Sequence, residues 1–161
     1  MDIVIRPIKP SDNADLARII RNALKEHGAD KPNTVFTDPT TDQLYKLFAE
    51  MKRSAYFTAL IDGVVVGGGG IYPSNGLDQD TVELVKMYLK PEIRGAGIGK
   101  TLLSKCLEEA KLLAYKTMYI ESMPELSRAV AIYEKLGFKY LDGPMGNTGH
   151  SGCGIWMKKA I

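Results

Sequence analysis

The stretch PEIRGAGIGKT, residues 91–101, decides how this chain is interpreted. It ends like a nucleoside-triphosphate loop, in which Gly, Lys and Ser or Thr follow an earlier glycine at a fixed spacing. The last three residues fit that pattern, but Arg94 stands where the first glycine belongs. The dinucleotide pattern G-x-G-x-x-G fails as well, because Lys100 replaces its third glycine. The stretch still combines glycines with positive charge at a helix start, which is typical of a phosphate-binding loop.

The neighbouring patterns place this loop between a strand and a helix. The run TVELVKMYL, residues 81–89, is apolar on both faces, as expected near the centre of a sheet. Apolar residues then recur at helical spacing over residues 98–113. The first N–H groups of a helix lack partners, and its dipole makes that end positive. We therefore predict a pyrophosphate cradle, formed by Arg94, Gly95, Ala96, Gly97, Ile98, Gly99 and Lys100; a glycine-rich helix entry without a ligand is the alternative.

A triphosphate site is disfavoured by what surrounds the loop. Such a site needs a glycine at position 94 and an acidic magnesium ligand at the end of another strand. Glu121 is the only acceptable candidate for that ligand. About sixty residues follow the loop, and they end in short strands instead of further strand–helix units.

Composition indicates one soluble domain over residues 1–161. The chain has 45% apolar and 25% charged residues, the balance of a globular protein. Its net charge is +2 and it has no lysine- or arginine-rich run, which argues against nucleic acid and anionic membranes as partners. Cys106 and Cys153 match no metal or redox spacing. Without a leader-like start or an apolar run of about 20 residues, we expect a cytoplasmic protein.

The rest of the chain alternates strands and helices. Strand patterns cover residues 2–8, 55–61, 64–72, 81–89, 116–122, 138–141 and 154–160, and helical patterns cover 16–24, 44–51, 98–113 and 126–136. Thr40 and Gln43 predict a capping box for the second helix. The glycine run 67–70 inside a strand indicates either close packing by a neighbouring element or close approach of a ligand. The fold class is therefore α/β, with a mixed sheet of the α+β kind instead of an all-parallel one.

Two segments resemble the signatures of one family, the GNAT N-acetyltransferases. LVKMYLKPEIRGAGIGKTLL, residues 84–103, is similar to the family's acetyl-CoA-binding motif [QR]-x-x-G-x-[GA], with Arg94, Gly97 and Gly99 at the fixed positions. AVAIYEKLGFKYL, residues 129–141, resembles the second motif, a helix that carries Tyr133. The order and spacing of the elements match the family over essentially the whole chain.

The resemblance implies a fold and a coenzyme. The expected fold is a mixed, mostly antiparallel sheet of about six to seven strands, with a splayed parallel pair and four flanking helices. The anion is then the pyrophosphate of acetyl-CoA, the acyl donor, and no metal is required. The pantetheine arm is expected in the gap between the splayed strands, against the backbone of Met87, Tyr88 and Leu89. A backbone N–H of Met87 or Leu89 would stabilise the thioester oxygen as it gains charge.

The resemblance also implies catalytic groups. Tyr133 occupies the place of the family tyrosine that protonates the coenzyme sulfur, although its position on an apolar stripe also fits a packed core residue. Strand alternation puts Glu83 on the same face as Val85, Met87 and Leu89, where its carboxylate could take the proton of the amine. His150, Glu121 and a chain of water molecules are the other candidates for the general base.

The acceptor side is less specified. Leu126 stands where many family members have an asparagine that contacts the coenzyme, so that contact is not carried over. The first candidates for acceptor binding are His150, Tyr72 and Phe36, and Tyr56 and Trp156 are further candidates. The expected activity is acetyl transfer to a primary amine of a small molecule or peptide, by direct attack in a ternary complex. The alternative is a catalytically silent acyl-CoA sensor or partner-binding protein. An exposed edge strand at the C-terminus would allow a homodimer.

Overall fold

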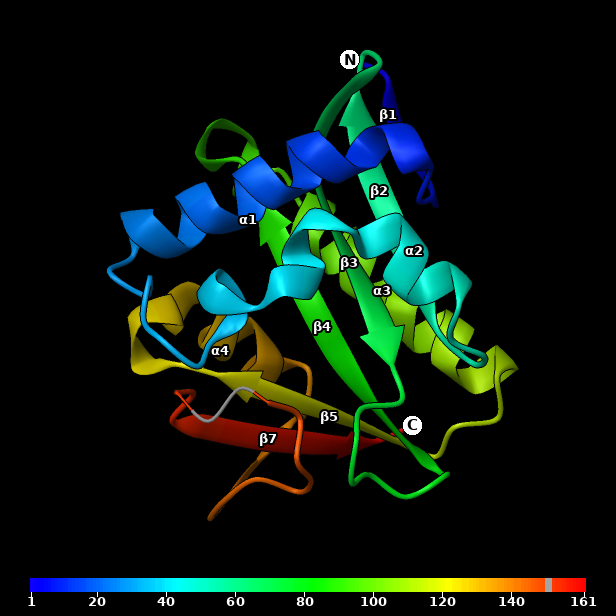
Figure 1. Cartoon of the computed structure of the whole chain (residues 1–161), viewed down its shortest axis with the longest axis vertical. Helices are drawn as coiled ribbons and strands as arrows, with labels where there is room; N and C mark the ends of the chain where they lie inside the picture. Colours follow the sequence, from blue (N-terminus) through cyan, green and yellow to red (C-terminus); the bar gives the residue numbers. More distant parts are fainter. Residues whose placement is uncertain (150–151) are drawn as a thin grey trace.

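The structure is a single mixed sheet with helices on both faces (Figure 1). It is a computed structural model that describes residues 1–149 and 152–161. The strands are β1 (Ile3–Pro7), β2 (Ala55–Ile61), β3 (Val64–Tyr72), β4 (Thr81–Leu89), β5 (Thr117–Ser122), β6 (Lys139–Leu141) and β7 (Ile155–Ala160). The helices are α1 (Asn13–Glu26), α2 (Leu44–Ala49), α3 (Ile98–Leu112) and α4 (Ser127–Lys135). The expected fold class is confirmed, and the candidate residue His150 lies outside the described residues.

Two hydrophobic layers hold the helices to the sheet. The apolar stripe of α1 packs with α2 on one face, where Leu16, Ile20, Leu24, Leu44 and Phe48 are buried. On the other face α3 and α4 bury Leu102, Leu103, Cys106, Val130 and Tyr133. Figure 1 shows α1 and α2 in front of the strands and α3 behind them. No helix in the described part of the chain is long and apolar enough to span a bilayer.

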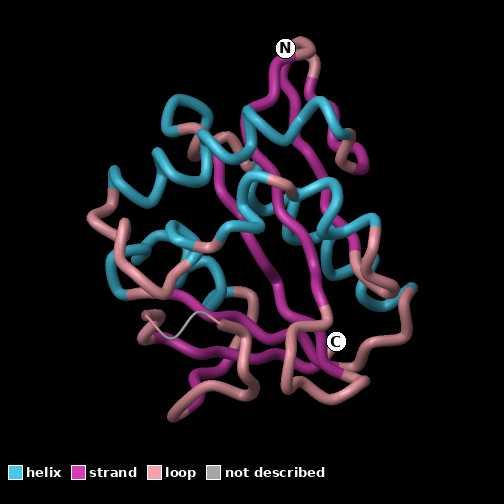
Figure 2. Tube along the Cα trace, in the orientation of Figure 1, coloured by secondary structure: helices cyan, strands magenta, loops and turns pink. Residues whose placement is uncertain are grey.

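The sheet order β1-β2-β3-β4-β5-β7-β6 has one parallel contact, between β4 and β5. These two strands pair only from Thr81–Thr117 to Glu83–Tyr119, after which they separate. Figure 2 shows their traces starting together near the C-terminus and diverging. The predicted splayed pair is therefore present. The C-terminal strand β7 lies between β5 and β6, so the prediction of an edge strand at the C-terminus was wrong: the edges are β1 and β6.

A bulge in β4 shifts its side chains by one residue. Gly68 pairs with Tyr88 and Gly70 with Val85, so that Gly69 alone opposes Lys86 and Met87. Lys86 has a φ of +50°, which is uncommon for a residue with a side chain. The buried Tyr56 hydroxyl donates a hydrogen bond of 2.8 Å to the Lys86 carbonyl and fixes this conformation.

Because of the bulge, the prediction that Glu83 shares one face of the strand with Val85, Met87 and Leu89 was wrong for Met87 and Leu89. Glu83 alternates with Leu84, which packs toward α3, and so it shares the α1 side with Val85. Beyond the bulge, Met87 and Leu89 pack with the α3 cluster and not with Val85. Strand alternation fails here because a bulge inserts one extra residue and reverses the faces that follow.

The glycine run of β3 is explained by close packing. A Cβ atom on Gly68 would lie 2.6 Å from a ring carbon of Tyr56, and one on Gly69 would lie 2.7 Å from the Met87 Cε. Both distances are shorter than a non-bonded carbon contact allows. Of the two predicted explanations, packing by neighbouring strands is therefore the one that the structure shows.

The predicted capping box of α2 was wrong. Thr40 lies inside a 3₁₀ turn, Pro39–Asp42, that precedes the helix. Asp38 caps this turn, since its Oδ1 accepts from the Thr40 backbone N–H at 2.9 Å and from the Thr40 hydroxyl at 2.7 Å. Pro39 at the first position favours that earlier turn.

Replacing Tyr56 with Phe should destabilise the protein by roughly 1–3 kcal/mol, because the buried Lys86 carbonyl loses its hydrogen bond. Urea unfolding measures the change. Tyr140→Phe is the matched control, since the Tyr140 ring is 55% exposed and its hydroxyl bonds to Glu134 at the surface. Equal losses in the two variants would show that the bond to Lys86 does not secure the bulge.

Candidate active site

A groove with a volume of about 630 Å³ occupies the space between the separated strands. It runs from the loop before α3 to the point where β4 and β5 meet, and α4 forms its wall. Its lining includes most of the predicted site residues, namely Glu83, Met87, Tyr88, Leu89, Arg94, Gly95, Gly97, Gly99, Lys100, Glu121 and Tyr133. Ala96 is exposed outside the lining, and the Ile98 side chain is buried in the α3 core.

At one end of the groove the chain presents backbone N–H groups without side chains in front of them. Gly95 and Gly97 have φ values of +87° and +84°, and Gly97 is the N-cap of α3. Apart from the glycine itself and the residues on either side of it in the chain, no described protein atom lies within 4 Å of the place where a Cβ would stand on either glycine. Within the described residues, no side chain caps this helix start. A pyrophosphate fits such a cradle, because it would accept hydrogen bonds from the first-turn N–H groups.

Arg94 stabilises the loop instead of pointing its charge into the cradle. Its Nε and Nη2 donate to the Leu89 carbonyl at 3.2 and 2.9 Å, and its Nη1 donates to Glu26 Oε2 at 2.5 Å. The guanidinium thus ties the loop to the end of β4 and to the last turn of α1. Among the predicted cradle residues, Lys100 keeps the exposed positive charge at the groove.

Tyr133 lines the groove from α4. Its ring is buried and packs against Phe138, with 5.8 Å between the ring centroids. Burial raises the pKa of its phenol to about 12. The phenol therefore keeps its proton at neutral pH and can donate it to a group that becomes strongly basic during a reaction.

Glu125 carries an unsatisfied acceptor beside the groove. Its Oε2 pairs with Lys31, while its Oε1 is buried and is the one buried side-chain oxygen or nitrogen without a hydrogen-bond partner in the described chain. An unpaired buried acceptor is costly, so a donor on a bound molecule would stabilise it. Glu125 directly precedes Leu126, the position where the family asparagine is missing.

Two carboxyl groups line the groove near the point where the strands part. Glu83 ends the paired part of β4, and Glu121 lies two residues beyond its partner Tyr119 on β5. Glu83 is 3% exposed and accepts a hydrogen bond from Ser74, and Glu121 accepts from Tyr119 at 2.7 Å and from Thr148. Burial, and next the charge of Glu121, raise the pKa of Glu83 to about 8. A carboxyl group with such a pKa exchanges its proton near neutral pH, as a general base must.

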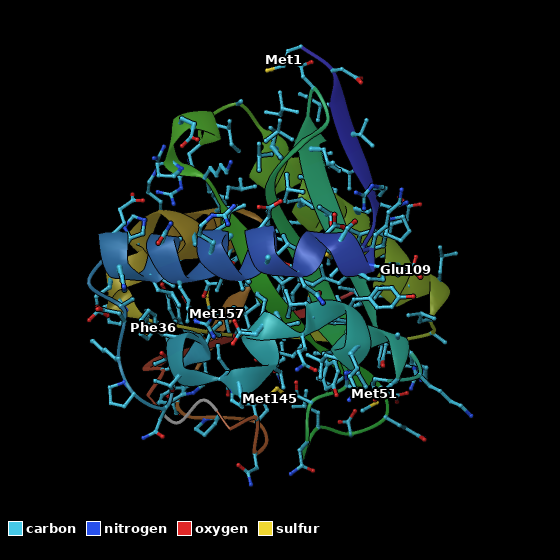
Figure 3. All side chains as sticks on the ribbon, turned by 45° about the horizontal axis from the view of Figure 1, so that its top comes forward. Met1, Phe36, Met51, Glu109, Met145 and Met157 are labelled. Atoms are coloured by element: carbon cyan, nitrogen blue, oxygen red, sulfur yellow. The ribbon has the colours of Figure 1, made fainter. Side chains whose placement is uncertain are left out.

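Three loops close this end of the groove. The β3–β4 loop supplies Ser74, and the β6–β7 loop supplies Thr148 and the Met145 N–H, which donates to Tyr119 at 3.2 Å. The two loops join each other through Asn147 and Asn75, at 2.8 Å. Gly152 N–H donates to the Asn33 carbonyl in the segment after α1, at 2.7 Å. Figure 3 labels Met145 in the β6–β7 loop and Phe36 in the segment after α1.

Of the predicted acceptor residues that the structure describes, none lines the groove. Tyr72 packs edge-on against Phe48 at 5.5 Å, and the half-buried Phe36 lies under the Lys25 ammonium at 5.7 Å. Tyr56 is a core residue bound to the β4 bulge, and Trp156 sits opposite Glu121 in the pairing of β5 with β7. Their aromatic character alone could not separate packing from binding.

Sequence reasoning missed the charged neighbours of Glu83. Lys86 is buried beside it in the groove lining, and its ammonium lies 3.2 Å from Asp38 Oδ2. A lysine inside a strand pattern gives no signal of burial. The bulge that turns it inward follows from the register of its pairing with β3, which the alternation of residues in β4 does not reveal.

Comparison with known proteins identifies the family. The profile of the acetyltransferase (GNAT) family matches residues 21–138. The chain belongs to this family. It is 41% identical over 160 residues to the uncharacterized N-acetyltransferase YjgM of Escherichia coli K12, covering 98% of this chain and 95% of that protein. As a family member it is an acetyltransferase that uses acetyl-CoA as acyl donor.

Solved structures share the whole fold. A GNAT acetyltransferase of Staphylococcus aureus Mu50 superposes with a TM-score of 0.86 at 19% identity, and 99% of each chain is covered. The PaiA N-acetyltransferase of Thermoplasma acidophilum, in complex with coenzyme A, superposes with a TM-score of 0.75 at 24% identity over the full length of both chains.

Replacing Glu83 with Gln should change how stability depends on pH. The folded pKa of about 8 lies above the ordinary 4.5, so between these values the folded state holds a proton that the unfolded state has lost. The free energy of unfolding should then fall as pH rises toward 8, by at most about 1.4 kcal/mol per pH unit. Glu83→Gln should remove this decline in urea unfolding at pH 5.5, 7 and 8.5. The exposed Glu92→Gln is the control, and a decline that survives in Glu83→Gln contradicts the assignment.

Proposed function

We propose that this protein acetylates the primary amine of a small molecule by direct attack in a ternary complex with acetyl-CoA. The observation that carries the proposal is the placement of Glu83 and Glu121 at the point where β4 and β5 part. The same groove contains Tyr133 and the glycine cradle. A small acceptor is favoured over a long peptide because three loops close around the carboxyl end of the groove.

The coenzyme would be held along the groove by groups that the sheet leaves available. The N–H groups at the start of α3 and the Lys100 ammonium would bind the pyrophosphate. The backbone of β4 after Glu83 faces the gap without a partner strand and would pair with the amides of the pantetheine arm. Glu125 Oε1 would accept a hydrogen bond from an N–H or O–H of that arm, in place of the missing asparagine.

The two ionisable groups would divide the proton transfers. Glu83 takes one proton from the acceptor ammonium and leaves a neutral amine, because only the neutral form is nucleophilic. The new N–C bond forms as the C–S bond of the bound thioester breaks. Tyr133 gives its proton to the departing sulfur, and the second proton released by the nitrogen restores the phenol. The buried position of Tyr133 and its high pKa keep this acid protonated until it is needed.

Acetyl transfer can be measured directly by following thiol release from acetyl-CoA over a panel of primary amines. Turnover on small amines supports the proposal. Tight binding of acetyl-CoA without turnover on any amine would instead indicate the catalytically silent sensor.

Replacing Gly97 with Val should raise the dissociation constant of acetyl-CoA by about tenfold or more, equivalent to about 1.4 kcal/mol. The side chain would occupy the open side of the cradle, and the φ of +84° disfavours a β-branched residue. Isothermal titration calorimetry measures the change. Gly143→Val is the control, since that glycine is outside the groove lining and has no neighbour within 4 Å. Unchanged affinity in Gly97→Val would contradict the cradle.

Replacing Tyr133 with Phe should lower kcat by roughly a hundredfold while the KM for acetyl-CoA changes little, because the ring stays in place and only the acid is lost. Steady-state kinetics at several pH values give both constants. A variant with the kcat of the parent protein would make Tyr133 a packing residue.

A further inference from the structure

Lys86 brings a positive charge to the closed end of the groove. It stands at the β4 bulge with a φ of +50°, a strained conformation that turns it toward the α1 side. Its side chain is only 4% exposed, yet the residue lines the groove next to Glu83. A buried ammonium is costly unless ion pairs and hydrogen bonds compensate for the lost water.

The compensation for this ammonium is incomplete. A lysine ammonium has three hydrogen-bond donors. Among the described residues, Lys86 makes one such bond, to Asp38 Oδ2 at 3.2 Å. Asp38 Oδ1 is turned to the Thr40 backbone N–H and hydroxyl. The charge of Arg21 acts on Lys86, but both Nη atoms of Arg21 donate hydrogen bonds to Asp42. Lys86 therefore keeps donor capacity at a place where a bound molecule would replace water.

The groove thus carries opposite charges side by side at this end. Glu83 and Glu121 lie where the strands part, and Lys86 follows Glu83 by three residues on the same strand. A molecule that places an ammonium near the carboxylates and an anionic oxygen near Lys86 would satisfy both. An amino acid has this pattern of charges within a few bonds.

We propose that Lys86 binds the carboxylate of the acceptor, and that the acceptor is an amino acid or a similarly compact amino carboxylate. The inference rests on the proposed function, since it assigns the class of the amine. Lys86 acts here as a specificity residue: it orients the acceptor so that its amine faces Glu83, and it takes no part in proton transfer.

The test compares acceptors that differ only at the carboxylate. Each amino acid of a panel is assayed beside its carboxamide and its decarboxylated amine. The parent protein should favour the carboxylates by about ten- to hundredfold in kcat/KM, the range expected for a hydrogen bond to a charged group. Lys86→Met should lose this preference, and Lys86→Arg should retain part of it. The dissociation constant for acetyl-CoA should be unchanged in both variants, which also shows that they are folded.

Asp38→Asn separates specificity from a structural role of the ion pair. If Lys86 binds the acceptor, this variant keeps the carboxylate preference even where its unfolding midpoint falls. If the ion pair only holds the segment after α1 against the sheet, Asp38→Asn and Lys86→Met should lower kcat/KM by the same factor for every acceptor. That result would overturn the inference. Turnover without any carboxylate preference in the parent protein overturns the inference and leaves the proposed function standing. No turnover on any amine overturns both.

Discussion

The site depends on the point at which β4 and β5 stop pairing. Up to Glu83 and Tyr119 the two strands are ordinary parallel neighbours, and beyond them the backbone of β4 faces a groove. Backbone groups left without partners are costly, so a fold keeps such a gap only where something else fills it. The gap is kept open from both sides, because β5 continues its pairing with β7 and the bulge bends β4 against β3.

The bulge links this gap to the chemistry. It requires a glycine opposite Met87, a tyrosine hydroxyl for the Lys86 carbonyl and an unusual φ at Lys86. Because of the bulge, the side chains of Met87 and Leu89 pack toward the α3 layer. The side chains of Glu83, Val85 and Lys86 remain on the α1 side. In the proposed complex, the coenzyme wall and the acceptor end of β4 are thereby built by residues on opposite faces of the strand.

The sequence predicted the parts of this arrangement that depend on local pattern. The order of strands and helices along the chain, the helix after the glycine loop and the parallel pair follow from periodicity and from two family motifs. The side-chain faces after residue 85 could not be predicted, because an added residue in a strand leaves the alternation of apolar residues looking regular. The orientation of Arg94 toward Glu26 was hidden for a related reason: Glu26 lies 68 residues away in the sequence and is brought close only by the folded chain. His150 stays an untested prediction.

The proposed division of labour follows from electrostatics at low solvent exposure. Burial raises the pKa of both Glu83 and Tyr133. Glu83 loses its proton near neutral pH, whereas Tyr133 loses its proton only far above neutral pH. The charge of Glu121 helps to keep Glu83 protonated in the free protein. An ammonium that enters between the two carboxyl groups offsets that repulsion and favours the anion of Glu83. In the proposed mechanism, binding of a protonated acceptor therefore prepares the base that will deprotonate it, so the carboxyl pair would respond to the substrate as well as to the pH of the solvent.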